Sequence, residues 1–219
     1  MLDFDDTMIK ESDYFLCIFS LFAEQEKIPM NKIDNFMLNF EYLRRNQEDI
    51  FEFFLRELKI HTIRNHERLF TLYKEIDCSI YPLPGVIDLV TYCKSRDIIV
   101  LCLTNGVVAA QKNKWEKLQL KLKNYIKFEV AGDYFLQKPD IDLYKILQMK
   151  YSIDWKKLIT IGDKFENDLS VPISLGAYAI SISKNLELNN LDLNGNKVVR
   201  ADNFIEAYNN FIHVHGRIY

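Results

Sequence analysis

The sequence has no long hydrophobic run. No apolar stretch approaches the ~20 residues that a membrane-spanning helix needs. The chain does not open with a basic segment followed by an apolar one, as a secretory signal does. Internal repeats, low-complexity tracts and long linkers are also absent. We therefore expect a globular, cytoplasmic protein with no membrane partner.

An excess of positive charge is missing as well. The chain has 28 basic and 31 acidic residues, which gives a formal net charge of -3. A protein that binds nucleic acid neutralises the phosphates with a basic surface, so we expect no nucleic-acid partner. The two signs of charge are interleaved along the chain, which is typical of solvated faces.

Cysteine is sparse, and no two cysteines have the spacing of metal ligands. The four residues are Cys17, Cys78, Cys93 and Cys102. A buried thiol packs as a small hydrophobic group, and disulfides are rare in a reducing cytoplasm. We expect four buried free thiols.

The length of 219 residues suits one main domain with a smaller inserted module. The pattern of the sequence changes near residues 82–85. Before this point, apolar residues recur at helical spacing, which predicts four amphipathic helices in a small bundle. The first would follow a cap at Ser12 or Asp13, and the others would span residues 31–43, 50–58 and 69–76.

After residue 85, strand-like and helix-like stretches alternate. The continuous apolar run over residues 98–103 predicts a strand that is covered on both faces. Alternation of this kind predicts right-handed crossovers and a parallel sheet flanked by helices, and ligands bind such sheets at the carboxyl ends of the strands. The further expected strands are 127–130, 158–161, 177–182 and 198–199, and the expected helices are 86–95, 109–118, 141–149 and 204–212.

Two acids lie at the start of the chain, in Asp3-Phe4-Asp5. If the backbone stays extended through Phe4, both carboxylates point to the same side, because side chains alternate along a strand. Such a pair repels and needs a cation, a shared proton or a task that uses both groups. A solvated loop of acids is the alternative interpretation.

Polar groups also follow the later strands. Thr104-Asn105-Gly106 follows the run 98–103, where a hydroxyl and backbone N–H groups suit an oxyanion or form an ordinary helix cap. Lys138 precedes Pro139, and proline is common in the first turn of a helix. Lys138 either belongs with these polar groups or is simply a surface cation. Asp163 and Asp168 follow the strand 158–161, where an acid has few partners unless a cation is present.

Taken in this order, the four groups of residues resemble the four-motif signature of the haloacid dehalogenase superfamily. The resemblance extends over essentially the whole chain and includes Pro84-Gly85 and Gly176-Ala177. It implies a Rossmann-like, three-layer α/β/α core formed by residues 1–8 and 83–219. It further implies that residues 9–82 form a helical cap inserted after the first motif.

The resemblance also implies a reaction, the magnesium-dependent hydrolysis of a small phosphorylated metabolite. Asp3 would be the nucleophile and form an aspartyl-phosphate, since a carboxylate attacks phosphorus without first losing a proton. Asp5 would protonate the leaving alkoxide and then activate water. Lys138 would complete the catalytic set.

The remaining implied roles concern the metal and the phosphoryl group. Mg²⁺ would be held by the Asp3 carboxylate, the Asp5 backbone carbonyl and Asp163, because this ion prefers oxygen ligands. Asp168 would orient the ion or its water, either as a direct ligand or through a hydrogen bond to a ligand. Phosphoryl oxygens would be bound by Thr104, Asn105 and Lys138.

Asp5 bears on the choice among the activities of this superfamily. A halide leaves without a proton, whereas an alkoxide needs one, so Asp5 favours a phosphatase over a haloacid dehalogenase. A phosphomutase uses the same residues and stays open. The natural substrate and the oligomeric state are not encoded in any motif.

The sequence departs from the family pattern in one respect. Only Met1 and Leu2 precede Asp3, although a typical strand has ~5–6 residues and chain ends fray. Three explanations stay open: a start internal to a longer chain, a chain that was shortened, or a true stub. The last would give a weak enzyme or a non-catalytic relative that binds a phosphorylated metabolite.

Overall fold

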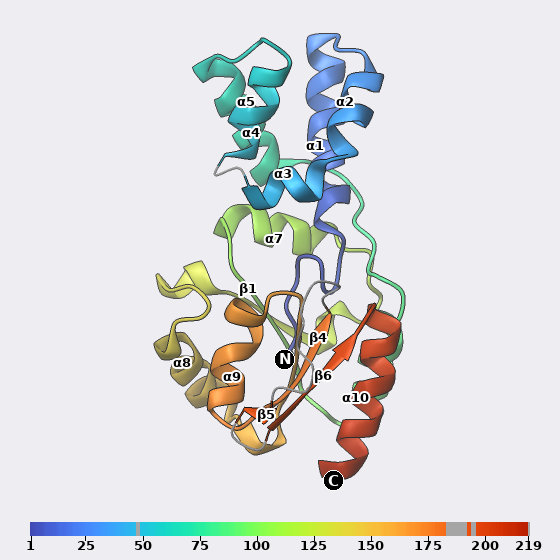
Figure 1. The fold of residues 1–219 in the computed structure, drawn as a ribbon, viewed down its shortest axis with the longest axis vertical. Helices are drawn as coiled ribbons and strands as arrows, with labels where there is room; N and C mark the ends of the chain where they lie inside the picture. The colour runs from blue at the N-terminus through green and yellow to red at the C-terminus, as the bar shows by residue number, and fades with distance from the viewer. Residues whose placement is uncertain (47–48, 183–191, 194–195, 219) are drawn as a thin grey trace. The chain divides into compact units, whose positions relative to one another are not determined.

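The computed structural model describes residues 1–46, 49–182, 192–193 and 196–218, and the chain forms two compact units (Figure 1). Unit 1 consists of Met1–Lys10, Tyr81–Val108 and Leu118–Tyr219, and unit 2 of Glu11–Ile80 and Ala109–Lys117. Within the described residues, every helix is too short or too polar to cross a bilayer.

The predicted parallel sheet is confirmed in unit 1. Strand β1 pairs in parallel with β2, and β3 pairs in parallel with β4, which pairs in parallel with β6. The short strand β5 lies antiparallel to β6. The strands are β1 (Val100–Thr104), β2 (Ile126–Val130), β3 (Ile159–Gly162), β4 (Tyr178–Ile182), β5 (Asp192–Leu193) and β6 (Asn196–Ala201).

The first three residues of the chain join the two groups of strands. Leu2 forms parallel bridges to Cys102 of β1 and to Ile161 of β3. The Leu2 N–H donates to the Leu101 carbonyl at 2.8 Å, and the Asp3 N–H donates to the Ile161 carbonyl at 2.9 Å. The N-terminal stub therefore occupies the centre of one sheet, between β1 and β3, and we call this position the seam.

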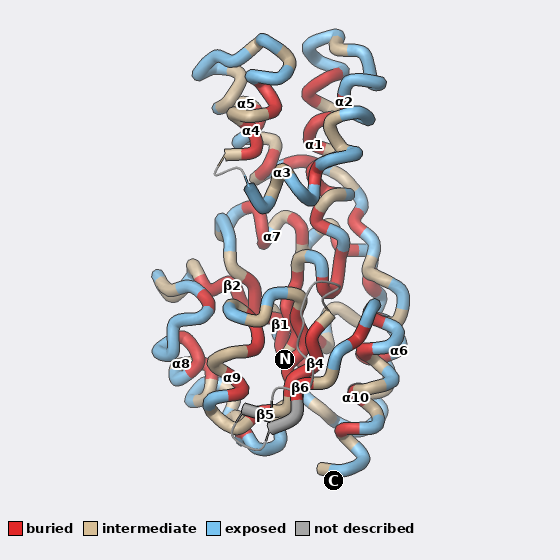
Figure 2. The backbone as a smooth tube through the Cα atoms, in the orientation of Figure 1, coloured by how far each residue is buried: buried red, intermediate tan, exposed pale blue. Residues whose placement is uncertain are grey.

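Helices cover both faces of the sheet (Figures 1 and 2). Leu101 and Leu103 pack in one buried cluster with Leu143 of α8, whereas Val100 lines a small cavity on the other face with Phe211 of α10. Every residue of β1 is buried, as expected for a strand between two helical layers. The fold is therefore the predicted three-layer, Rossmann-like α/β/α arrangement. The helices of unit 1 are α6 (Val86–Lys94), α8 (Ile141–Tyr151), α9 (Ser170–Ser174) and α10 (Phe204–Ile218), with the short turns η1 (Lys123–Tyr125), η2 (Ala131–Tyr134), η3 (Trp155–Lys157) and η4 (Phe165–Leu169).

Unit 2 is helical and has an aromatic core. The rings of Phe19 and Phe54 stack with centroids 4.2 Å apart. Phe15, Phe19 and Phe22 are buried on the first helix, so the apolar face expected from the helical spacing is present. Two expectations were wrong in detail, because the first helix begins at Glu11 and residues 31–43 form parts of two helices. The helices are α1 (Glu11–Glu26), α2 (Met30–Met37), α3 (Phe40–Asn46), α4 (Ile50–Glu57) and α5 (Ile63–Glu75).

Helix α7 (Val108–Lys117) follows β1 in the sequence but packs mostly with unit 2. The Asn113 amide donates to the Tyr14 hydroxyl at 3.1 Å and to the Ile76 carbonyl at 2.9 Å. The ammonium of Lys114 is fully buried and lies 3.7 Å from a carboxylate oxygen of Glu11. Residues 109–117 therefore belong to unit 2, whereas the sequence-based boundaries place them in the α/β/α core.

Candidate active site

Asp3 lies at the end of the seam and is 9% exposed. Its backbone is fixed by the bond to Ile161, and the chain bends directly after it at Phe4. The Phe4 carbonyl accepts hydrogen bonds from the N–H groups of Met8 and Ile9. Because the backbone turns here, strand alternation alone does not fix the direction of the half-buried Asp5 side chain.

Lys138 brings two carboxylates together. Its Nζ donates to Asp3 Oδ1 at 2.5 Å, to Asp168 Oδ1 at 2.7 Å and to the Leu103 carbonyl at 2.9 Å. These three bonds use all three hydrogens of the ammonium. The side chain is only 4% exposed, so its position is set by these acceptors.

Asn105 holds the backbone of Lys138 in place. The Asn105 Oδ1 accepts from the Lys138 N–H at 2.7 Å, and its Nδ2 donates to the Lys138 carbonyl at 3.0 Å. The buried hydroxyl of Thr104 donates to the Asn105 carbonyl at 3.0 Å. The two residues expected to contact phosphate therefore also build the loop that carries the lysine.

The π-helical turn η4 follows β3 and places Asp168 beside the end of that strand. Its Oδ2 accepts from the Lys164 N–H at 2.9 Å. The approach to the strand is so close that a Cβ added at Gly162 would lie 2.4 Å from the Cβ of Asp168. Glycine is thus required at the strand end for the acid to occupy this position, a role that the sequence pattern did not reveal.

Three carboxylates form a group that could hold a metal ion. One oxygen each from Asp3, Asp163 and Asp168 lies within 4.8 Å of the other two. Asp163 Oδ1 is buried and has no hydrogen-bond partner in the described part of the chain. Since buried polar atoms are normally paired, and since magnesium and calcium prefer carboxylate oxygens, these residues fit a divalent cation.

The charges at the site support the same conclusion. Three carboxylates face one ammonium, which leaves two negative charges when all groups are ionised. Burial raises the pKa of Asp3 to about 8, and the Asp168 carboxylate adds to this effect while Lys138 opposes it. Burial likewise raises the pKa of Asp163 to about 7. A bound divalent cation would balance the charge and lower both pKa values.

The structure brings together most of the residues that the sequence singled out. Asp3, Lys138 and Asp168 are in direct contact, and Asp163 completes the acid group. Thr104 and Asn105 lie beside Lys138, and Asp5 follows two residues after Asp3 but is not a member of the acid group. Sequence reasoning missed the Leu103 carbonyl, which no side-chain motif could signal.

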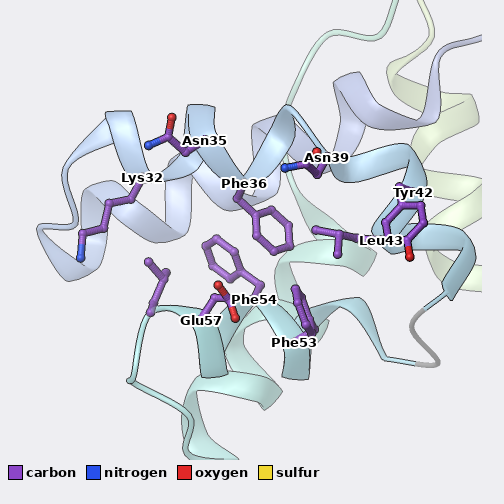
Figure 3. A pocket seen from close by; sticks show the side chains of 10 residues that line it. Lys32, Asn35, Phe36, Asn39, Tyr42, Leu43, Phe53, Phe54 and Glu57 are labelled. Atoms are coloured by element: carbon purple, nitrogen blue, oxygen red, sulfur yellow. The ribbon is translucent and has the colours of Figure 1, made fainter.

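A cavity of about 490 Å³ lies elsewhere, in unit 2 (Figure 3). Phe36, Phe53 and Phe54 form its aromatic wall, and the amides of Asn35 and Asn39 lie at its rim. None of the acids, hydroxyls or amides of the predicted site lines it, so it is separate from the carboxylate group.

Comparisons with known proteins agree on one family. The model of haloacid dehalogenase-like hydrolases matches residues 1–177. No curated protein matched the chain significantly.

Solved structures show the same fold at low sequence identity. YfnB from Bacillus subtilis, solved bound to magnesium, has a TM-score of 0.70 at 15% identity and covers 98% of this chain and 96% of its own. A candidate β-phosphoglucomutase from Thermotoga maritima has a TM-score of 0.67 at 19% identity, with 97% of each chain covered. CbbY from Rhodobacter sphaeroides, in complex with xylulose-(1,5)bisphosphate, has a TM-score of 0.58 at 14% identity and covers 94% of this chain and 93% of its own. Dehalogenases are also among the matched structures, so the fold alone does not choose an activity.

Proposed function

The chain belongs to the haloacid dehalogenase-like hydrolases, and we propose that it is a magnesium-dependent phosphatase acting on a small phosphorylated metabolite. The observation that carries the proposal is the contact of Lys138 with Asp3 and Asp168 beside the unpaired oxygen of Asp163. Members of this family generally use Mg²⁺ and act on small phosphorylated substrates.

In this proposal, Asp3 is the nucleophile. An ionised carboxylate attacks phosphorus directly, and the P–O bond to the alcohol breaks to leave an aspartyl-phosphate. The Lys138 bond at 2.5 Å fixes one oxygen of Asp3 and favours its ionised form. Hydrolysis of the aspartyl-phosphate then returns Asp3 and releases phosphate.

Asp5 supplies and later removes a proton. A phosphate ester leaves as an alkoxide, which Asp5 protonates in the first step, and the resulting carboxylate then deprotonates water in the second. A carbon–halogen bond would need no such acid. Asp5 thus favours a phosphatase over a dehalogenase, while a phosphomutase would use the same groups and differ in the acceptor.

The metal would be held by Asp3 and Asp163, with the Asp5 backbone carbonyl as a further ligand. When bound, Mg²⁺ neutralises charge on the transferred phosphoryl oxygens. Both oxygens of Asp168 already accept hydrogen bonds, from Lys138 and from the Lys164 N–H. Each oxygen keeps a second lone pair, so Asp168 would orient the ion or its water, either as a direct ligand or through a hydrogen bond to one. Thr104, Asn105 and Lys138 would contact the phosphoryl oxygens. A phosphoryl oxygen bound by Lys138 would replace one of the three oxygens that its ammonium now contacts.

We also propose that the helices of residues 9–82 act as the cap that selects the substrate. This role follows from their position in the sequence, inserted directly after the first motif. Closure of such a cap over the site would sequester the reaction from water and commit the substrate.

The decisive experiment is phosphate release from a panel of phosphorylated metabolites by the wild type and by Asp3→Asn, with Mg²⁺ and with chelator. Release that needs both Asp3 and Mg²⁺ is expected, with circular dichroism showing an intact fold in the variant. Unchanged release by Asp3→Asn, after mass spectrometry excludes deamidation, would refute the nucleophile.

Two further assays separate the alternatives. Transfer of phosphate between positions of one sugar would identify a phosphomutase, and halide release from a haloacid would identify a dehalogenase. Binding of a phosphorylated metabolite without any turnover would instead indicate a non-catalytic relative.

A further inference from the structure

Two cysteines of unit 2 line the same cavity. Cys17 lies on α1, and Cys78 lies in the segment that follows α5. Their side chains lie close enough for each thiol to shift the pKa of the other, and both are free and partly exposed. The expectation of four buried thiols therefore holds only for Cys93 and Cys102, which are buried in unit 1.

The pair is accessible to small molecules. Cys17 and Cys78 line one cavity of about 560 Å³ together with Ser20, Glu24 and Met30. A cavity of this size admits a peroxide or a small disulfide. In unit 1, Cys93 is buried and lines a much smaller cavity of about 70 Å³.

The surroundings make Cys17 the more reactive thiol. The Cys78 thiol lowers the pKa of Cys17 to about 7, against the opposing effects of burial and of the Asp13 carboxylate. The Cys17 thiol, burial and Asp77 raise the pKa of Cys78, while Lys117 opposes this shift. Because the thiolate is the nucleophile in thiol chemistry, Cys17 is expected to react first at neutral pH.

We propose that Cys17 and Cys78 form a reversible intramolecular disulfide on exposure to hydrogen peroxide. In the first step the Cys17 sulfur attacks one peroxide oxygen, so that an S–O bond forms, the O–O bond breaks, and the released hydroxide takes up a proton to become water. In the second step the Cys78 sulfur attacks the Cys17 sulfur, an S–S bond replaces the S–O bond, and the hydroxyl leaves as water with the proton of Cys78. Two thiols are oxidised, one peroxide is reduced, and a dithiol reductant reverses the reaction.

The disulfide would link α1 to the end of unit 2. Cys78 lies close to Tyr81, the residue at which the chain enters unit 1. The bond closes a loop from residue 17 to residue 78, which reduces the conformational freedom of the unfolded chain. Oxidation should therefore raise the thermal midpoint of unit 2, by about 5–10 °C.

The test is disulfide mapping of the full chain. The protein is treated with hydrogen peroxide, its remaining thiols are alkylated, and peptides are analysed by mass spectrometry without reduction. We expect a linked peptide that contains Cys17 and Cys78 and disappears with dithiothreitol. Alkylation of Cys17 in the untreated protein should be faster than that of Cys93.

Variants identify the order of events. In Cys78→Ser, a dimedone adduct is expected on Cys17, because the second sulfur is missing. Cys93→Ser is the matched control and should form the linked peptide as the wild type does. Recovery of Cys17 and Cys78 unlinked in the peroxide-treated wild type, or linkage to Cys93 or Cys102 instead, would overturn the proposal.

Discussion

Asn105 and Lys138 are joined by two hydrogen bonds between the amide of the first and the backbone of the second, at 2.7 and 3.0 Å. This pairing fixes the loop from which the Lys138 side chain reaches Asp3. The amide of Asn105 is thus engaged by protein groups before any substrate arrives.

Replacement of Asn105 by alanine should therefore lower kcat/KM by about 10- to 100-fold, because the lysine is no longer held in position. Steady-state kinetics with the best phosphate ester would measure this. Asn210→Ala is the control, since it removes a similar side-chain-to-backbone bond, to Arg200, on the exposed part of α10. Equal activity of Asn105→Ala and the wild type would show that Lys138 needs no such support.

Gly162→Ala should inactivate the enzyme without unfolding it. The added Cβ would lie 2.4 Å from Asp168 Cβ and 2.8 Å from Asp168 Oδ2, so the acid must move and its bond to Lys138 must change. We expect a loss of about 100-fold or more in kcat. Gly216→Ala on α10 is the matched control, because nothing lies within 4 Å of its new Cβ. If both variants retained full activity, the position of Asp168 would not matter to the reaction.

Asp5→Asn should affect substrates according to their leaving groups. An alkyl phosphate needs a proton on its leaving oxygen, whereas p-nitrophenolate leaves readily without one. Single-turnover kinetics should show a loss of about 100-fold with the alkyl ester and a much smaller loss with p-nitrophenyl phosphate. Asp88→Asn is the control, because Asp88 is exposed on α6. An equal loss with both esters would argue against Asp5 as the acid.

Mg²⁺ should stabilise the protein through Asp163. At ~100 times the dissociation constant, a ligand specific for the folded state adds about 2.7 kcal/mol of stability. Because Asp3 and Asp163 have raised pKa values of about 8 and about 7, both bind protons below neutral pH, and the ion must displace them. The rise in Tm should therefore grow between about pH 5 and pH 8.

Asp163→Asn should abolish most of that rise, as measured by thermal unfolding with Mg²⁺ and with chelator. Asp142→Asn, which changes an exposed acid on α8, should leave the rise unchanged. A full Mg²⁺ effect in Asp163→Asn would place the ion elsewhere.

Asp49 should make unit 2 sensitive to acid. Its carboxylate caps α4 by accepting from Phe51 and Glu52 N–H and pairs with His66 at 2.7 Å. Burial alone would raise the pKa of Asp49, but the bonds from Glu52 and His66 lower it below its ordinary value of 3.8. The carboxylate therefore contributes stability above that value, and the contribution is lost as pH falls through the folded-state pKa.

Asp49→Ala should cost about 1 kcal/mol at neutral pH and less near about pH 3, where the wild type has lost the same contribution. Urea unfolding at both pH values would measure this. Asp34→Ala, on the exposed face of α2, should show neither effect. A cost for Asp49→Ala that is independent of pH would exclude the carboxylate as its source.

The sequence predicted the sheet and the meeting of its acids for one physical reason. Parallel strands end at the same edge, so Asp3 and Asp163, placed after two such strands, had to lie near each other. The apolar run before Thr104 predicted a doubly covered strand, and that prediction is confirmed.

What escaped prediction depends on tertiary contacts. Helix α7 has the same pattern as any crossover helix, and only the partners of Asn113 and Lys114 assign it to unit 2. The meeting of Cys17 and Cys78 at one cavity is likewise invisible to a reading of local periodicity. The amide of Asn105 was expected to bind phosphate, and its two hydrogen bonds to the Lys138 backbone are a further role that the sequence pattern did not reveal.

The position of Leu2 in the seam links activity to the integrity of the sheet. Hydrogen bonds on both of its sides hold β1 and β3 together, and the next residue is the proposed nucleophile. Any opening of the sheet at its centre therefore removes Asp3 from Lys138 in the same event. Turnover would then report the integrity of the sheet itself. A ligand bound at Asp3 would stabilise the connection between the strands on the β1 side and those on the β3 side.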